Sequence, residues 1–259
     1  MSQSLRVLAL FAHPDDVEFL CAGTLFLLAD RGAEIHLATM TAGDCGSSVL
    51  PAREISRVRL QEGERAAGLL GASFTSLKER DLLVLYDKRT LWKVMELVRR
   101  IDAVLVLTHS PSDYMLDHEI TSRLCQTACF GAMAPNFHTG VRTPAKPTRA
   151  IPHLYYAQPI GFTDILGKDV IPGLCVNIAA SLERKERMLA CHASQRAWLK
   201  SQQGLTGTAD TMRKMAARTG ELAGFAWGEG FRQHLGQGFP SSDLLSAALG
   251  EAITRRREV

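Results

Sequence analysis

The sequence predicts an α/β fold, a Rossmann-like, doubly wound and mostly parallel sheet with helices on both faces. Two observations predict it. Short apolar runs alternate with longer amphipathic stretches along the first half of the chain, which is typical of strands joined by crossover helices. The runs are also apolar throughout, so the strands are expected to be buried on both faces, as parallel strands are.

The elements are expected in the following order. Arg6–Ala12 is apolar and bounded by polar residues, which predicts a buried strand, and Phe19–Arg31 predicts a helix that stops at Gly32. Ala52–Leu70 is amphipathic and predicts a long helix that ends before Gly71. The remaining strands are expected at Glu34–Thr41, Ala103–Thr108, His153–Gln158 and Cys175–Ala179. The remaining helices are expected at Leu91–Arg100, Ile120–Phe130, Leu182–Lys200 and Thr208–Arg218.

One domain is expected for the whole chain, residues 1–259, because no repeat or low-complexity linker divides the pattern. The Rossmann-like core would cover about residues 6–134. The stretch 134–150 is rich in Pro and basic side chains and predicts a loop, and about residues 150–259 would add to the sheet or cover it.

The composition is that of an ordinary globular protein, with 46% hydrophobic and 22% charged residues. A net charge of +3 is too small to indicate a nucleic-acid partner or a membrane surface. No apolar run reaches the ~18 residues of a membrane span, the first residues lack a secretory signal, and the six Cys include no CxxC pair. A cytoplasmic protein with reduced thiols is therefore expected.

Polar side chains gather directly after two of the predicted strands. The first strand is followed by "HPDD", residues 13–16, and the third by "HSPSDYMLDHE", residues 109–119. The carboxyl ends of parallel strands lie at one edge of the sheet, where ligand sites form. Pro14 has no N–H group, so it interrupts the first strand and forces a turn.

These side chains predict a metal site. Across the turn, His13 and Asp16 can converge on one point, and His118 can supply a third ligand from the other strand end. Two His and one carboxylate with an open position are typical of catalytic zinc, so one Zn²⁺ per chain is expected, although Fe²⁺ and Co²⁺ suit the same ligands. Asp15, beside the metal, would accept the proton of the attacking water. Asp117 would orient a ligand imidazole.

The same residues resemble a known family. "AHPDDVE", residues 12–18, is similar to the signature of the LmbE-like, or PIG-L, zinc-dependent de-N-acetylases, which include the deacetylases of mycothiol and bacillithiol synthesis and diacetylchitobiose deacetylase. The resemblance covers most of residues 6–232. It continues in the family's order through "GTLFLLADRGAEIHLATMTAGDCG", "REISRVRLQEGERAAGLLGA", "DYMLDHEITS", "VNIAASLERKERMLACHASQ" and "AWGEGFR".

The resemblance implies an activity and partners. His13, Asp16 and His118 would hold the metal, and Asp15 would be the general base in hydrolysis of the N-acetyl group of an amino sugar or glycoconjugate. It also implies a homo-oligomer, often a trimer or hexamer in this family.

One position departs from the family's pattern. Met115 stands where a His usually serves as acid or oxyanion stabiliser. His192, in the family's His-x-Ser-Gln pattern, is the expected catalytic substitute, with His109 and Tyr114 as alternatives. Arg53, near the end of the glycine-containing loop, and Tyr114 are expected to contact the substrate.

Two other functions fit parts of the pattern. His13-x-Asp15 with a distant His is also the ligand pattern of non-haem iron oxygenases, but those enzymes are β jelly rolls, whereas this chain alternates strand and helix. A catalytically weak or silent sugar-binding protein of the same fold would explain Met115. The presence of Asp15 argues against it, because neither metal binding nor sugar binding needs that carboxylate.

Overall fold

The computed structural model describes residues 4–196, 198 and 207–255. The strands are β1 (Arg6–Phe11), β2 (Glu34–Thr41), β3 (Ser73–Glu79), β4 (Leu105–Thr108), β5 (His153–Ala157), β6 (Leu174–Asn177), β7 (Gly228–Gln233) and β8 (Ile253–Arg255). The helices are α1 (Asp16–Leu20), α2 (Ala22–Ala29), α3 (Ala52–Leu70), α4 (Lys88–Ile101), α5 (Leu116–Gly131), α6 (Leu182–Ala190), α8 (Thr208–Glu221) and α9 (Leu244–Leu249), with 3₁₀ turns η1 (Ile160–Phe162) and η2 (Gly250–Ala252).

All eight of these strands form one sheet in the order β3-β2-β1-β4-β5-β7-β6-β8. β1 pairs in parallel with β2 and β4, β2 with β3, and β4 with β5. β7 is antiparallel to β5 and β6, and β8 is antiparallel to β6. The predicted α/β fold with a mostly parallel sheet is therefore confirmed, and it is not the jelly roll that the iron-oxygenase alternative requires. The single-domain organisation stays a prediction, which this continuous sheet supports.

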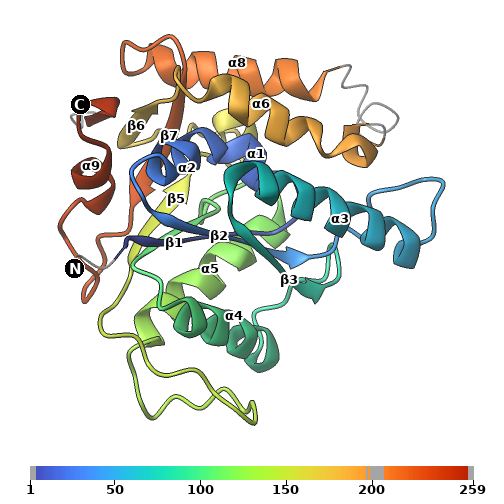
Figure 1. The fold of residues 1–259 in the computed structure, drawn as a ribbon, viewed down its shortest axis with the longest axis vertical. Helices are drawn as coiled ribbons and strands as arrows, with labels where there is room; N and C mark the ends of the chain where they lie inside the picture. The colour runs from blue at the N-terminus through green and yellow to red at the C-terminus, as the bar shows by residue number, and fades with distance from the viewer. Residues whose placement is uncertain (1–3, 197, 199–206, 256–259) are drawn as a thin grey trace.

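Helices cover both faces of the sheet (Figure 1): α4 and α5 lie on one side, and α1, α2, α3 and α6 on the other. The side chains of β1 show why. Val7 and Phe11 pack in the core with α2 and α6, while Leu8 and Leu10 pack in a second core with α4 and α5, and all four are fully buried. Because successive side chains of a strand point to opposite faces, a strand covered on both faces needs an uninterrupted apolar run.

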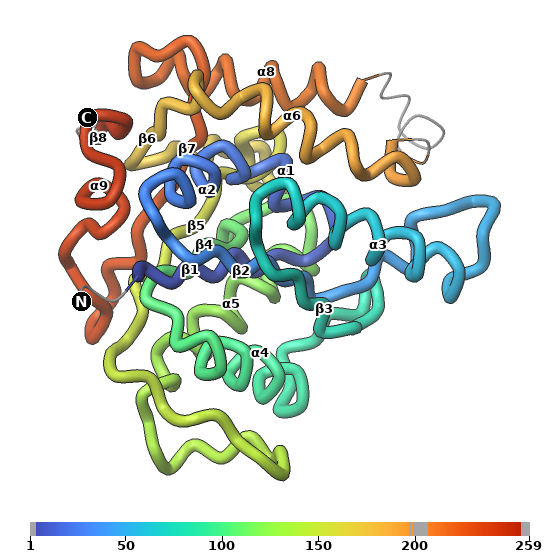
Figure 2. The backbone as a smooth tube through the Cα atoms, viewed as in Figure 1, coloured from blue at the N-terminus to red at the C-terminus, as the bar shows by residue number. Residues whose placement is uncertain are grey.

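Segments from the end of the chain complete the layer above the sheet. Figure 2 shows α6 and α8 lying over α1 and α2, although they follow these helices by more than half of the chain, and α6 contacts both α1 and α2. No helix in the described part of the chain is both long and apolar enough to span a bilayer. No disulfide joins any of the six Cys in the described structure.

The predicted helix Phe19–Arg31 is wrong, because two helices, α1 and α2, meet at Cys21, whose φ of −148° is not helical. A carboxylate from β7 makes this break possible. Glu229 accepts the backbone N–H groups of Gly23 and Thr24 at 2.9 and 2.7 Å, so the first turn of α2 obtains the partners that a new helix start needs.

Several other boundaries differ from expectation. α5 begins at Leu116, four residues earlier than expected, and α6 ends at Ala190. Residues 193–196 are helical again, and the expected helix end at Lys200 lies outside the described residues. β3, β7, β8 and α9 were not expected. β3, "SFTSLKE", is a polar edge strand with alternating burial, and β7, "GEGFRQ", contains two glycines, so neither has the apolar run that reveals a strand.

A buried ion pair joins β7 to the N-terminal helices. Lys185 Nζ lies 2.5 Å from Glu229 Oε1 and donates to the Phe19 carbonyl at 2.8 Å, and both charged side chains are only 2% exposed. Replacing Glu229 with Gln is expected to lower the free energy of unfolding by ~3–5 kcal/mol, because Lys185 would stay buried without a counter-ion. Denaturant unfolding measures this.

Asp30→Asn is a matched control for Glu229→Gln. It makes the same carboxylate-to-amide change in a surface pair, Asp30 with Arg184, whose side chains are 49% and 32% exposed, and surface pairs contribute little. Equal unfolding midpoints for the two variants would contradict a stabilising role for the buried pair.

Candidate metal centre

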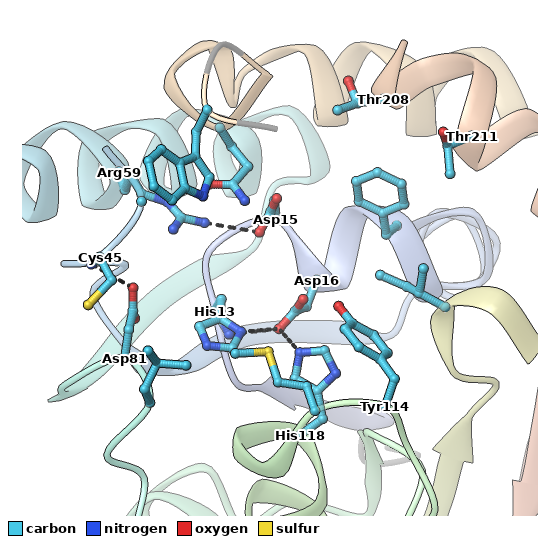
Figure 3. Close-up of a pocket in the computed structure, with 17 residues that line it drawn as sticks. His13, Asp15, Asp16, Cys45, Arg59, Asp81, Tyr114, His118, Thr208 and Thr211 are labelled. Carbon is cyan, nitrogen blue, oxygen red and sulfur yellow. Dashed lines mark hydrogen bonds and ion pairs between the residues drawn. The ribbon is translucent and has the colours of Figure 1, made fainter. Parts of the chain in front are cut away.

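The carboxyl ends of β1 and β4 deliver side chains to one pocket of about 290 Å³ (Figure 3). The turn after β1 contributes His13, Asp15 and Asp16, and the segment after β4 contributes Tyr114 and His118. The two polar segments that the sequence places after separate strands therefore meet at one edge of the sheet.

Three of these residues could hold a metal ion. His13, Asp16 and His118 each offer a ligand atom, and these atoms lie within 4.8 Å of one another. Asp16 Oδ2 is 3.3 Å from His13 Nδ1 and 3.7 Å from His118 Nε2. The same oxygen accepts the backbone N–H of His13 at 2.7 Å, which holds the carboxylate across the turn.

The second nitrogen of each imidazole meets another carboxylate. His13 Nε2 lies 3.2 Å from Asp117 Oδ2, and His118 Nδ1 lies 3.0 Å from Asp113 Oδ1. A carboxylate accepts hydrogen bonds, so in a neutral ring the proton sits on these outer nitrogens, and the nitrogen facing Asp16 keeps its lone pair. The inner nitrogens of His13 and His118 and the Asp16 carboxylate then present lone pairs to the same point, which suits a divalent cation.

Burial and charge set the pKa values of this group. Burial lowers the pKa of His13, but the hydrogen bonds with Asp117 and Asp16 outweigh it and raise the pKa to about 10. Burial raises the pKa of Asp16, but the charges of His118 and His109 outweigh it and hold the pKa well below its usual range. The carboxylates thus favour positive charge at the centre, which a metal cation would also supply.

His109 supports the centre from behind. It is fully buried and is not among the residues that line the pocket. Its ring stacks on that of His118 with the centroids 3.8 Å apart, and its Nε2 accepts the backbone N–H of Ala12 at 3.0 Å and lies 3.1 Å from Asp16 Oδ2. Burial lowers the pKa of His109 to about 4. His109 therefore packs against ligand residues rather than facing a substrate.

Asp15 enters the pocket from a strained turn. Its φ of 106° lies outside the conformations that side chains other than glycine prefer. Arg59 Nη2 donates to Asp15 Oδ1 at 3.1 Å and to the Pro14 carbonyl at 2.5 Å, which fixes this turn. Burial raises the pKa of Asp15 to about 6, although the charge of Arg59 opposes the shift.

The glycine-containing loop after β2 leaves the space for Arg59. A Cβ atom at Gly43 would lie 2.5 Å from Arg59 Cδ, and the φ of Gly43 is +74°. Sequence reasoning missed Arg59, and it missed Asp113. One signal could have revealed Arg59: it is a charged residue on the same helix face as the apolar residues Ile55 and Ala66. In the structure this face of α3 is buried, and Arg59 is only 2% exposed.

The residues expected to act on the substrate divide into two groups. Tyr114 and Met115 line the pocket. The Tyr114 ring packs edge-on against His118 at 5.2 Å, and Figure 3 shows its hydroxyl directed toward Asp16. Tyr114 is half exposed, but the desolvation of its hydroxyl and the nearby charges of Asp16 and Asp113 raise its pKa, so the hydroxyl keeps its proton.

His192 and Arg53 are not brought to this pocket. His192 is 3% exposed, its Nε2 lies 3.0 Å from Glu18 Oε1, and it is not among the lining residues. Burial lowers the pKa of His192, but the charge of Glu18 outweighs it, so the pKa is raised. Arg53 is exposed and lies on a separate groove along the outer side of α3.

Known proteins match both the sequence and the fold. Residues 8–129 match the family model described as PIG-L: GlcNAc-PI de-N-acetylase. The 4-oxalmesaconate hydratase of Pseudomonas putida is 28% identical over 148 residues, which are 54% of this chain and 57% of the relative. Diacetylchitobiose deacetylase of Thermococcus kodakarensis is 26% identical over 196 residues, 73% of this chain and 70% of the relative. The match to the hydratase thus spans less than two thirds of that relative's length.

A solved structure shares the fold. The N,N'-diacetylchitobiose deacetylase from Pyrococcus horikoshii superposes with a TM-score of 0.75 at 24% identity, over 93% of this chain and 89% of that chain. The family match contains the turn after β1, the Arg59 helix and the His118 segment. Over residues 8–129, the chain is thus similar to the PIG-L family.

Proposed function

We propose that this chain is a metal-dependent hydrolase that removes the N-acetyl group of an amino sugar or glycoconjugate. The observation that carries the proposal is a spare carboxylate, Asp15, in the same pocket as His13, Asp16 and His118. Asp15 is held by Arg59 and takes no part in the ligand cluster. Hydrolysis of an amide needs such a base to take the proton of the attacking water.

The three-residue cluster would hold one divalent ion, which we propose to be Zn²⁺, with Fe²⁺ or Co²⁺ able to replace it. Such an ion, when bound, acidifies water and polarises a carbonyl group. Asp15 accepts the proton of the water as it attacks the amide carbon, and it can then pass this proton to the departing amine. Asp117 and Asp113 hold the two imidazoles in the orientation that leaves their inner nitrogens free.

The pocket wall supports a sugar as the substrate. Three buried polar atoms of its lining residues have no hydrogen-bond partner in the described structure: Arg59 Nε, Asp81 Oδ1 and Gln195 Oε1. The hydroxyl groups of a sugar can both donate and accept, so one sugar ring could satisfy such a mixed set. Phe19 and Trp198 add aromatic surface to the same lining.

Tyr114 is our candidate for the role that Met115 cannot fill. Its hydroxyl can donate to the oxyanion that forms at the amide carbon. Tyr114→Phe is expected to lower kcat by ~10²–10³-fold, the usual cost of losing one oxyanion donor, with metal content unchanged. Steady-state kinetics with elemental analysis measure both.

His192→Ala is the matched comparison for Tyr114→Phe. His192 pairs with Glu18 and does not itself line the pocket, so a smaller loss of activity is expected for His192→Ala. Met115→His, which restores the family's usual side chain, is expected to recover part of the activity in the Tyr114→Phe background. If His192→Ala lost more activity than Tyr114→Phe, the role would belong to His192.

Hydration of an unsaturated organic acid is a second candidate, favoured by the similarity to the 4-oxalmesaconate hydratase. Two assays separate it from deacetylation and from a silent sugar-binding protein. Release of acetate from N-acetylglucosamine compounds supports the deacetylase. Loss of the ultraviolet absorbance of a conjugated acid supports the hydratase, and binding of the sugar without either reaction supports the silent protein. A homo-oligomer and a cytoplasmic location remain proposals that rest on the family resemblance and on composition.

A further inference from the structure

We propose that the pocket selects uncharged N-acylated amino sugars over those that carry a phosphate or carboxylate, and that Asp81 is the selecting side chain. The inference rests on the proposed function, because it specifies the substrate class of the same site.

No lining residue that the structure describes is a Lys or Arg free of a carboxylate partner. Among the lining residues that the structure describes, Arg59 is the only Lys or Arg. Its Nη2 donates to Asp15 and to the Pro14 carbonyl, and the residue is only 2% exposed. Anionic groups in binding sites are usually held by a free Arg or Lys, whereas the charge of this buried guanidinium is already paired with Asp15, although its Nε has no partner in the described structure.

Asp81 places a carboxylate in the wall, and no Lys or Arg of the described residues forms an ion pair with it. Its Oδ2 accepts the Cys45 backbone N–H at 2.9 Å, its Oδ1 has no partner in the described structure, and the residue is 7% exposed. The neighbouring Arg80 pairs instead with Asp44, at 3.0 Å. Figure 3 shows Asp81 beside Cys45 on the same side of the pocket as His13. A buried charge without a counter-ion is weakly screened and acts over several ångströms.

The residues behind the centre add to this negative field. Asp117 and Asp113 contact imidazoles and backbone N–H groups, and no Lys or Arg in the described part of the chain pairs with either carboxylate. A divalent ion and Arg59 would together bring three positive charges, enough to balance three of the five carboxylates Asp15, Asp16, Asp81, Asp113 and Asp117. The remaining carboxylates therefore leave the surroundings of the pocket negative. A sugar hydroxyl can donate to a carboxylate oxygen, whereas a second anion cannot and is repelled.

The experiment compares two glycosides of N-acetylglucosamine that differ in one group, a carboxylate in one and its methylamide in the other. The purified metal-loaded protein is expected to cleave the methylamide with a kcat/KM ~10-fold or more above that of the carboxylate, since like charges oppose binding. Added salt should raise kcat/KM for the carboxylate and leave the methylamide unchanged, because salt screens repulsion. This salt test needs no variant.

Asp81→Asn removes the charge and keeps an oxygen for the Cys45 N–H. It is expected to reduce the ratio of the two kcat/KM values at least ~3-fold. Asp164→Asn is the matched control, because Asp164 does not line the pocket and its side chain accepts only backbone N–H groups of its own loop in the described structure, and its ratio should equal that of the wild type. A wild-type preference for the carboxylate, or equal ratios in wild type and Asp81→Asn, would overturn the inference.

The proposed function can fail separately. If neither glycoside is cleaved, the deacetylase proposal fails, and the charge preference is then read from the relative affinities of the two glycosides by calorimetry. Tighter binding of the methylamide would support selection by charge in a protein that does not cleave it. Equal affinities, or tighter binding of the carboxylate, would overturn the inference.

Discussion

Replacing Asp15 with Asn is expected to lower kcat for N-acetyl hydrolysis by ~10²–10⁴-fold while the metal stays bound, because an amide cannot accept the proton of the attacking water. The fold should survive the change. Asn adopts positive φ more readily than most residues, which suits the φ of 106° at this position, and its side-chain oxygen can still accept the hydrogen bond from Arg59. Acetate release and elemental analysis on the same sample measure the two quantities.

Asp164→Asn is a control with the same chemical change. Asp164 lies on the loop after η1, where its side chain accepts the backbone N–H groups of Leu166 and Lys168, and it does not line the pocket that contains Asp15. Near-normal turnover by Asp15→Asn would mean that another group is the base. Loss of the metal from Asp15→Asn would mean that Asp15 helps to bind it.

His118→Ala is expected to abolish hydrolysis and to reduce the bound metal to well below one ion per chain. The variant removes one of three ligands, and the Asp113 carboxylate that oriented its imidazole stays behind as an unpaired buried charge, so His13 and Asp16 alone would hold the ion weakly. Elemental analysis after dialysis measures the metal.

His138→Ala tests whether the loss of metal is specific. His138 is exposed on the loop after α5 and has no place in the described ligand clusters, so this variant should keep a full complement of metal. Full metal content in His118→Ala itself would reject the ligand assignment.

The parts of the site that could be predicted depend on local sequence. Pro14 and two adjacent Asp directly after an apolar strand predict a turn. This turn alone is enough to bring the His13 ring close to the Asp16 carboxylate. Arg59 could not be assigned in this way. Its partner Asp15 is 44 positions away, and only the packing of α3 against the turn after β1 brings the two together.

Strands that are buried on both faces of the sheet could be predicted from the sequence, whereas strands with an exposed or polar face could not. β1 is apolar at every buried position, whereas β3 and β7 carry polar residues and glycines and pair at positions that their own sequence does not reveal. The break at Cys21 has the same origin, because the sequence of the helix gives no reason to stop and the reason lies in β7. For His192, the local sequence pointed to a role that the contacts do not display. Its motif suggested a catalytic role, but its imidazole ring is paired with Glu18.

The carboxylate of Glu229 also governs when the protein can fold. It bonds Gly23 from 206 positions away and Thr24 from 205, and a ribosome releases Gly23 and Thr24 long before it releases Glu229. During most of synthesis, the first N–H groups of α2 therefore lack the Glu229 carboxylate that accepts their hydrogen bonds. The Phe19 carbonyl likewise lacks the Lys185 ammonium that donates to it. Contacts of such wide sequence separation form slowly, and the apolar faces of β1 and α2 stay uncovered until they form. A nascent or truncated chain that ends before β7 would consequently be a substrate for chaperones rather than a smaller working enzyme.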